Sequence, residues 1–109
     1  MHELALAEDI VDAVASRVGP REVGRVRLRV GALVAVVPDA MRFCFDVVSH
    51  DTLLEGAVLE IESVAARARC THCLAEFEMV DGLPLCACGS SNVTILSGQE
   101  LVIQDVEVR

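Results

Sequence analysis

The segment that decides the fold of this chain reads Cys70-Thr71-His72-Cys73, then twelve residues, then Cys86-Ala87-Cys88-Gly89. Two close cysteine pairs separated by a short hairpin place four soft ligands on facing turns, which is the arrangement of a closed tetrahedral zinc site. Asp81-Gly82, between the pairs, is a good turn signal. We therefore expect a small zinc-ribbon-like insert over residues 70–94, folded in large part by its metal.

The second cysteine pair departs from the usual ribbon pattern, because it is Cys-x-Cys where a ribbon normally has Cys-x-x-Cys. Leu85 stands where the first cysteine of the usual pair would be. The shorter chelate loop also loses backbone N–H groups that would hydrogen-bond the thiolates. Two ligand sets therefore stay open, the four cysteines or three of them with His72. The four cysteines are Cys70, Cys73, Cys86 and Cys88.

Two other interpretations of the cysteines are weaker. The four thiols could be buried or free without any metal. A redox motif of the thioredoxin kind should lie between a strand and a helix, whereas Cys70-Thr71-His72-Cys73 follows a predicted strand and enters a hairpin. The fifth cysteine, Cys44, lies among apolar residues and is expected to be a buried small hydrophobe.

The length and composition of the chain limit what it can be. Its 109 residues allow one ordinary core, or a small core with a satellite. Apolar residues make up 53% of the sequence and aromatic residues only 3%, so the core must consist mainly of Val, Leu, Ala and Ile. The formal net charge of -8 disfavours binding to nucleic acid or to an anionic membrane, because both need a basic protein face.

We expect neither a signal peptide nor a membrane span. Acidic residues interrupt the first dozen positions, which therefore lack a basic n-region and a continuous apolar h-region. No segment approaches the roughly 20 apolar residues that cross a bilayer. The expectation is a soluble cytoplasmic protein, and in that reducing compartment five cysteines are typical of metal ligands or thiols rather than of disulfides.

Outside the cysteine segment, hydrophobic periodicity predicts two helices and three strands. The first helix ends at Gly19-Pro20, and Pro38 opens the second, which runs to about His50. The predicted elements are helices over 4–18 and 38–50 and strands over 25–30, 58–64 and 100–108. Together they indicate an α/β (α+β) domain with a three-stranded sheet, made of residues 1–69 and 95–109 and interrupted by the insert.

Two charged features outside the cysteines have ordinary structural explanations. Arg25, Arg27 and Arg29 alternate with apolar residues, which is typical of a solvated strand face, although such a row could dock an acidic partner. Glutamates of the 58–64 strand could face these arginines. His50, at the end of the second predicted helix, is expected to cap that helix, because no second metal ligand at a usable spacing accompanies it.

The N-terminal sequence Met1-His2-Glu3 can form a metal chelate. The large side chain of His2 should prevent removal of Met1 and so preserve its free amine. The Met1 amine, the deprotonated amide nitrogen of His2 and a His2 ring nitrogen can bind one ion in fused rings, and such in-plane nitrogen donors suit square-planar nickel(II) or copper(II). The amide or the carboxylate of Glu3 can provide a fourth donor.

On its own this N-terminal motif is weak. A three-residue match has a high false-positive risk, and the simpler interpretation is a solvated histidine ahead of a helix. In that interpretation Glu3 merely lies favourably near the positive end of the helix.

The whole chain resembles the HypA/HybF family, the nickel metallochaperones of hydrogenase maturation. The resemblance is carried by the order and spacing of five motifs along the sequence. They are Met1-His2-Glu3-Leu4, Arg29-Val30-Gly31-Ala32-Leu33, the Cys70–Cys73 pair, Cys88-Gly89-Ser90 and Ser97-Gly98-Gln99-Glu100-Leu101. Leu85, where the family has a cysteine, leaves the zinc ligand set in question and does not affect the N-terminal motif.

The resemblance implies a function that composition and spacing do not show. It implies a nonenzymatic carrier with His2 as the essential nickel ligand, nearby donors from Met1 and Glu3, Ni(II) as cargo and Zn(II) as a structural ion. The implied partners are a nickel-handling GTPase and the precursor of the [NiFe]-hydrogenase large subunit, and in some members the proteins of urease maturation. The rivals are a zinc-ribbon interaction module without a nickel role and a thiol redox protein.

Overall fold

The computed structural model describes residues 2–109 and has an α+β fold. Its elements are α1 (Glu3–Val18), β1 (Val23–Gly31), η1 (Ala32–Val34), α2 (Pro38–Ser49), β2 (Val58–Val64), β3 (Arg67–Cys70), β4 (Glu76–Glu78), η2 (Val80–Gly82), β5 (Val93–Ser97) and β6 (Leu101–Val108). Met1 lies outside the described residues. None of the helices described is long and apolar enough to cross a membrane.

The chain divides into two compact units. The first consists of the residues up to Arg29 together with Val36–Glu62 and Val102–Arg109, and the second consists of Val30–Ala35 and Ser63–Leu101. The predicted insert, residues 70–94, falls inside the second unit, which is larger because it also includes β3, β5 and the segment around η1.

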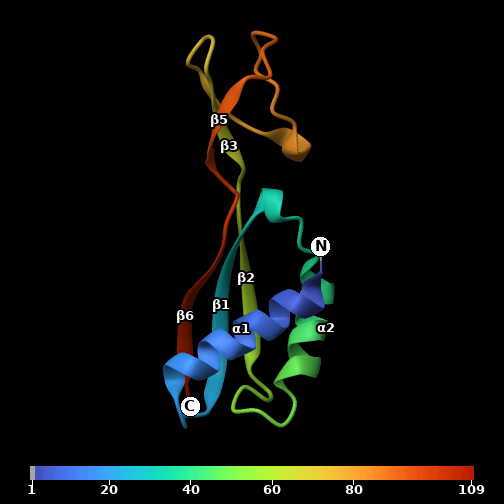
Figure 1. Ribbon diagram of the computed structural model, residues 1–109, viewed down its shortest axis with the longest axis vertical. Coiled ribbons are helices and arrows are strands. Elements are labelled where there is room, and N and C mark those ends of the chain that lie inside the picture. The colour runs from blue at the N-terminus through green and yellow to red at the C-terminus, as the bar shows by residue number, and fades with distance from the viewer. Residues whose placement is uncertain (1) are drawn as a thin grey trace. The chain divides into compact units, whose positions relative to one another are not determined.

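The first unit contains the predicted three-stranded sheet, in the order β2-β1-β6, and both predicted helices (Figure 1). The helices pack on each other and cover one face of the sheet (Figure 1). Val26 and Leu28 of β1 are buried, whereas the arginines that alternate with them lie on the other, more exposed side of the strand, as the alternating pattern predicts. Phe45 and Met41 of α2 and Val14 of α1 complete this core.

The second unit has a sheet of its own, in the order β4-β3-β5, with β3 antiparallel to both neighbours. The periodicity of the sequence does not predict these three short strands. The core beneath them is small, consisting of the buried side chains of Ala66, Ala68 and Met79. Leu33, Phe77 and Val93 pack against it and are only partly buried. Apolar burial in this unit is therefore limited.

Two glycines let backbone segments of the second unit approach closely. A Cβ atom on Gly31 would overlap the carbonyl group of Gly98. The N–H of Gly31 donates to the carbonyl oxygen of Glu100 at 2.8 Å, and the N–H of Leu33 donates to that of Gly98 at 2.9 Å. Gly98 itself has a φ of +93°, in the region that favours glycine. Both residues belong to motifs of the family resemblance.

Candidate metal centre

The four cysteines of the two pairs are brought together at one end of the second unit. Cys70 is the last residue of β3, and the chain turns back immediately, with the Leu74 N–H donating to the Cys70 carbonyl at 3.0 Å. The second pair lies in a similar tight turn, where the Gly89 N–H donates to the Cys86 carbonyl at 2.9 Å. The N–H and the hydroxyl of Thr71 both donate to the Asn92 carbonyl, which ties the two turns to each other.

The thiol sulfurs lie at the spacing of a tetrahedral site. The Sγ atoms of Cys70 and Cys88 are 3.7 Å apart, and those of Cys73 and Cys86 are 3.5 Å apart. All four sulfurs lie within 4.8 Å of one another. Metal–sulfur bonds of about 2.3 Å in a regular tetrahedron give sulfur–sulfur edges of about 3.8 Å, so the donor set fits a zinc ion in size and softness.

His72 and Leu85 lie outside this group of sulfurs. The His72 imidazole is exposed and does not join the four thiols, although its backbone N–H donates to the Cys70 sulfur at 3.4 Å. The Leu85 side chain points to solvent, and Cys86, one position later, is the buried residue whose sulfur joins the cluster. The shorter Cys-x-Cys spacing is therefore compatible with four converging thiols.

Backbone donors make the four thiols unequal in the absence of metal. The Cys73 N–H, at 3.5 Å, and the His72 N–H lower the pKa of the Cys70 thiol to about 6. The Cys88 N–H also favours the thiolate of Cys86, yet burial and the neighbouring Cys73 thiol raise the pKa of Cys86 to about 12. At neutral pH the Cys70 thiol is thus largely ionised and able to bind a metal, whereas metal binding must displace the proton of Cys86.

At the N-terminus, the structure places His2 and Glu3 at the start of α1. His2 is the exposed residue that precedes the helix, and its carbonyl accepts the Leu6 N–H at 3.2 Å while its side chain caps no backbone group. The Glu3 carboxylate accepts the N–H of Val37, the residue before α2, at 3.2 Å. This hydrogen bond lowers the pKa of Glu3. Met1, the remaining predicted donor, lies outside the described residues.

The neighbourhood of His50 differs from the expectation. His50 ends α2, and its own N–H donates to the Val47 carbonyl at 3.4 Å, as expected for a cap. Two carboxylates do accompany it, however, because a left-handed residue, Asp51, turns the chain so that Glu55 comes within 2.9 Å of the imidazole. All three side chains are exposed.

Cys44, which the sequence predicts to be a buried small hydrophobe, is only partly buried.

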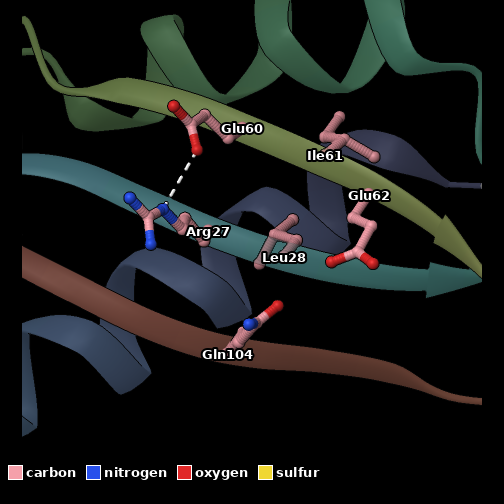
Figure 2. Close-up of a pocket in the computed structure, with 6 residues that line it drawn as sticks. All are labelled: Arg27, Leu28, Glu60, Ile61, Glu62 and Gln104. Carbon is pink, nitrogen blue, oxygen red and sulfur yellow. Dashed lines mark hydrogen bonds and ion pairs between the residues drawn. The ribbon is translucent and has the colours of Figure 1, made fainter.

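The arginine row on the open face of the first sheet is matched by acidic side chains from both neighbouring strands. Arg27 lies within 3.3 Å of carboxylates on β2 and β6, and Figure 2 shows its ion pair with Glu60. The negative charges of Asp105, Glu60 and Glu107 raise the pKa of Arg27. Arg25 pairs with Glu60 at 3.3 Å, and Arg29 with Glu62 at 3.7 Å. The predicted pairing of β1 arginines with β2 glutamates is therefore confirmed.

A hollow of about 260 Å³ lies beside this row of ion pairs (Figure 2). Its lining residues are Arg27, Leu28, Glu60, Ile61, Glu62 and Gln104. The one arginine in it is already neutralised by carboxylates, so the hollow offers no free positive charge to an anion. These contacts support a solvated face over docking of an acidic partner.

Comparisons with known proteins identify the family of the chain and agree with its fold. Residues 1–108 match the sequence model of a family described as hydrogenase/urease nickel incorporation, metallochaperone, HypA. The hydrogenase maturation factor HypA of a Nostoc species is 42% identical over 108 residues, covering 99% of this chain and 96% of that protein. The factor of the same name from Geotalea uraniireducens is 43% identical over 109 residues, covering 99% of both.

The fold is also that of a solved family member. The solution structure of the nickel metallochaperone HypA from Helicobacter pylori superposes with a TM-score of 0.69 at 23% identity, covering 99% of this chain and 97% of that one. At 23% identity the superposition shows that the two proteins share a fold and nothing more. The sequence matches extend over almost the entire chain, and it therefore belongs to the HypA family of nickel-incorporation metallochaperones in hydrogenase maturation.

Proposed function

We propose that this chain binds Ni(II) at its N-terminus, through Met1, His2 and Glu3, and delivers the ion to the [NiFe]-hydrogenase large subunit during maturation. The observation that supports it best is the exposed His2 at the start of α1 in a chain of this nickel-incorporation family. An exposed imidazole without a capping role is free to turn toward an ion. Exposure also lets donors of a receiving protein approach before the first ligands leave.

The surroundings of Glu3 bear on which of its atoms binds the ion. Its carboxylate already accepts the Val37 N–H, whereas the first N–H groups of a helix have no acceptor within the helix. We therefore favour the backbone nitrogen of Glu3 over its carboxylate as the fourth donor, beside the Met1 amine and two nitrogens of His2. Such a set of nitrogen donors suits square-planar nickel(II).

We further propose that the second unit holds a structural Zn(II) through Cys70, Cys73, Cys86 and Cys88, without His72. The convergence of four sulfurs and the position of the His72 imidazole outside their group support this set. The bound ion would supply the folding free energy that the small core beneath β3 lacks. Its role in this proposal is structural, and the nickel cargo does not pass through it.

The remaining assignments follow from family membership. We propose that the chain is a carrier without enzymatic activity of its own and that it works in the cytoplasm. Its partners would be a nickel-handling GTPase of hydrogenase maturation and the hydrogenase large-subunit precursor. Proteins of urease maturation are further candidates, because the family description names both hydrogenase and urease. Neither nucleic acid nor a membrane is among the proposed partners.

Nickel titration of the untagged protein tests the N-terminal site. The zinc-loaded wild type and a His2→Ala variant should differ, with the variant losing the high-affinity site. His72→Ala is the matched control, because that histidine is also exposed but lies beside the thiol cluster. Equal nickel affinity of the wild type and the His2→Ala variant would leave a zinc-ribbon interaction module as the better description.

A further inference from the structure

Three side chains that can bind a metal converge just after the end of α2. His50, Asp51 and Glu55 each offer one ligand atom, and these atoms lie within 4.8 Å of one another. The Nδ1 atom of His50 is 2.9 Å from Oε2 of Glu55, and its Nε2 atom is 3.6 Å from Oδ2 of Asp51. The imidazole distinguishes this group from an ordinary cluster of surface carboxylates, because its nitrogen is a ligand that nickel and zinc favour.

The Glu55 carboxylate determines which nitrogen of His50 is available to a metal. An ionised carboxylate only accepts hydrogen bonds, so its 2.9 Å contact with Nδ1 requires the proton of the imidazole to be on Nδ1. In the neutral ring the free lone pair is then on Nε2. Histidines that bind metals usually donate their other N–H to a carboxylate, which orients the ring and makes the binding nitrogen more basic. His50 and Glu55 have this arrangement.

The same carboxylate also holds the second ligand residue. The backbone N–H of Asp51 donates to Oε2 of Glu55 at 2.6 Å. Asp51 has a φ of +61°, so the chain turns immediately after the helix and places the Asp51 side chain beside Nε2 of His50. Glu55 therefore positions His50 through its side chain and Asp51 through its backbone.

The loop that carries these residues is fixed by other contacts. The Leu54 side chain is fully buried, and its N–H donates to the Thr52 hydroxyl at 3.1 Å. That hydroxyl donates to the Ser49 carbonyl at 2.6 Å. The guanidinium of Arg109 donates to the backbone carbonyl of Glu55 at 3.1 Å. None of these contacts uses an atom that would bind the metal, so the loop is held in place without occupying its ligands.

The distance between the two free donors fits a shared ion. Metal bonds to an imidazole nitrogen and to a carboxylate oxygen of about 2.0–2.2 Å place neighbouring donors about 3.0–3.5 Å apart. The observed 3.6 Å between Nε2 of His50 and Oδ2 of Asp51 is slightly longer. The Asp51 side chain is 85% exposed, so a small rotation brings its oxygen to the ion. The exposure of His50 leaves the remaining coordination positions to water.

The local charges favour a cation. The group lies beyond the C-terminal end of α2, where the helix dipole is negative. Asp51 and Glu55 add two carboxylates, and the guanidinium of Arg109 is bonded to a backbone carbonyl of this loop. The donor set also selects among cations, because Mg²⁺ and Ca²⁺ take oxygen ligands, whereas an imidazole suits Ni(II) and Zn(II). The chemistry therefore indicates a borderline divalent ion.

We propose that His50 and Asp51 form an exchangeable site for one borderline divalent ion, such as Ni(II), with Glu55 as the positioning residue. This inference goes beyond the proposed function and shares no ligand with the N-terminal motif. Glu3 is bonded to Val37, just before α2, whereas His50 follows the other end of this helix. A helix of 12 residues is about 18 Å long, so one ion cannot bind both sites.

Nickel titration followed by NMR tests the proposal on the zinc-loaded full chain. The protein carries His2→Ala, which removes the proposed N-terminal site. Paramagnetic Ni(II) should broaden the amide signals of residues 49–56 before those of the rest of the first unit. His50→Ala in the same background should abolish this localised response. His72→Ala is the matched control and should leave the response unchanged, because this histidine is also exposed but lies beside the thiol cluster.

Two variants of Glu55 test its positioning role. Glu55→Ala should weaken nickel binding by about 10–100-fold, which is typical when a group that orients a metal ligand is lost. Glu55→Gln should restore most of the affinity, because its amide oxygen can still accept from Nδ1 of His50 and from the N–H of Asp51. The amide spectrum of each variant outside residues 49–56 reports whether the first unit is folded.

Magnesium titration distinguishes an imidazole site from a simple group of carboxylates. Mg(II) should leave the amide signals of residues 49–56 almost unshifted, because its preferred ligands are oxygens. An equal response to Mg(II) and Ni(II) would overturn the proposal. So would unchanged broadening in the folded His50→Ala variant, or no localised response to Ni(II) in the His2→Ala protein. Equal affinity of the Glu55→Ala variant would exclude the positioning role. If the N-terminal site itself proved not to bind nickel, the results for His50 would still stand.

Discussion

Removal of the metal should unfold the second unit and leave the first unit folded. The buried apolar cluster beneath the sheet of the second unit comprises Ala66, Ala68 and Met79. Burial contributes about 1.5–3 kcal/mol for a methionine and about 0.8 kcal/mol for each alanine methyl, or about 3–5 kcal/mol in all. A structural zinc ion in a small domain contributes about 10–16 kcal/mol at neutral pH. The metal therefore outweighs the core that it supports.

Hydrogen exchange measured by NMR provides the assay. After treatment with a chelator, the amides of β3 and β5 should lose their protection, whereas those of Ile10 and Val14 in α1, which line the other core, should keep it. Addition of zinc should restore the original spectrum. Protection of β3 and β5 that persists in demonstrably metal-free protein would refute the reasoning, because the small core would then be sufficient.

Three further perturbations probe other parts of the structure. Zinc binding at pH 7 should release fewer than four protons, because the low pKa of Cys70, about 6, leaves that thiol largely ionised before the metal binds. Calorimetry in buffers of different ionisation enthalpy measures the number of protons released. Gly31→Ala should cost about 2–4 kcal/mol in urea unfolding through overlap and weakened backbone hydrogen bonds. In Gly24→Ala the new Cβ would lie 3.3 Å from the flexible side chain of Arg109 and in ordinary contact, 3.8 Å, with the Glu107 carbonyl oxygen, so this variant should cost much less. Equal losses for the two variants would contradict the argument. Phe45→Ala should lower the free energy of unfolding by about 3–5 kcal/mol and Phe43→Ala by about 0.5 kcal/mol or less, because Phe45 is buried and Phe43 is exposed. Similar decreases in melting temperature for the two variants would contradict this assignment of the buried face of α2.

The elements of the first unit could be predicted from the sequence because each has one buried and one solvated face. The strand β2 spans the predicted residues 58–64, and α1 and β6 differ from their predicted ranges by a single residue. Within α2 the prediction is less informative, since apolar residues occur on both sides of the helix. Phe45 is buried and Phe43 is exposed, and nothing in the local sequence distinguishes them.

The second unit could be predicted only through its cysteines. The strands β3, β4 and β5 have three to five residues, too few for a periodic pattern, and two of the three buried residues of the core beneath them are alanines. Spacing predicted that the two cysteine pairs meet but left open whether His72 joins them, and the position of its imidazole outside the group of four thiols depends on where a turn directs one side chain. The carboxylates near His50 were missed for a similar reason, since the left-handed Asp51 brings Glu55 back toward it.

The hydrogen bond between the Glu3 carboxylate and the Val37 N–H has a consequence for metal capture. In a flexible terminus, fixing each residue around an ion would cost about 1–2 kcal/mol of free energy in lost backbone conformational entropy. Residue 3 is already part of α1, and its side chain is anchored to the residue that precedes α2. Folding has therefore preorganised this part of the proposed ligand set, and selective loss of the anchor, as in Glu3→Ala, should weaken nickel binding even though the nitrogen donors remain.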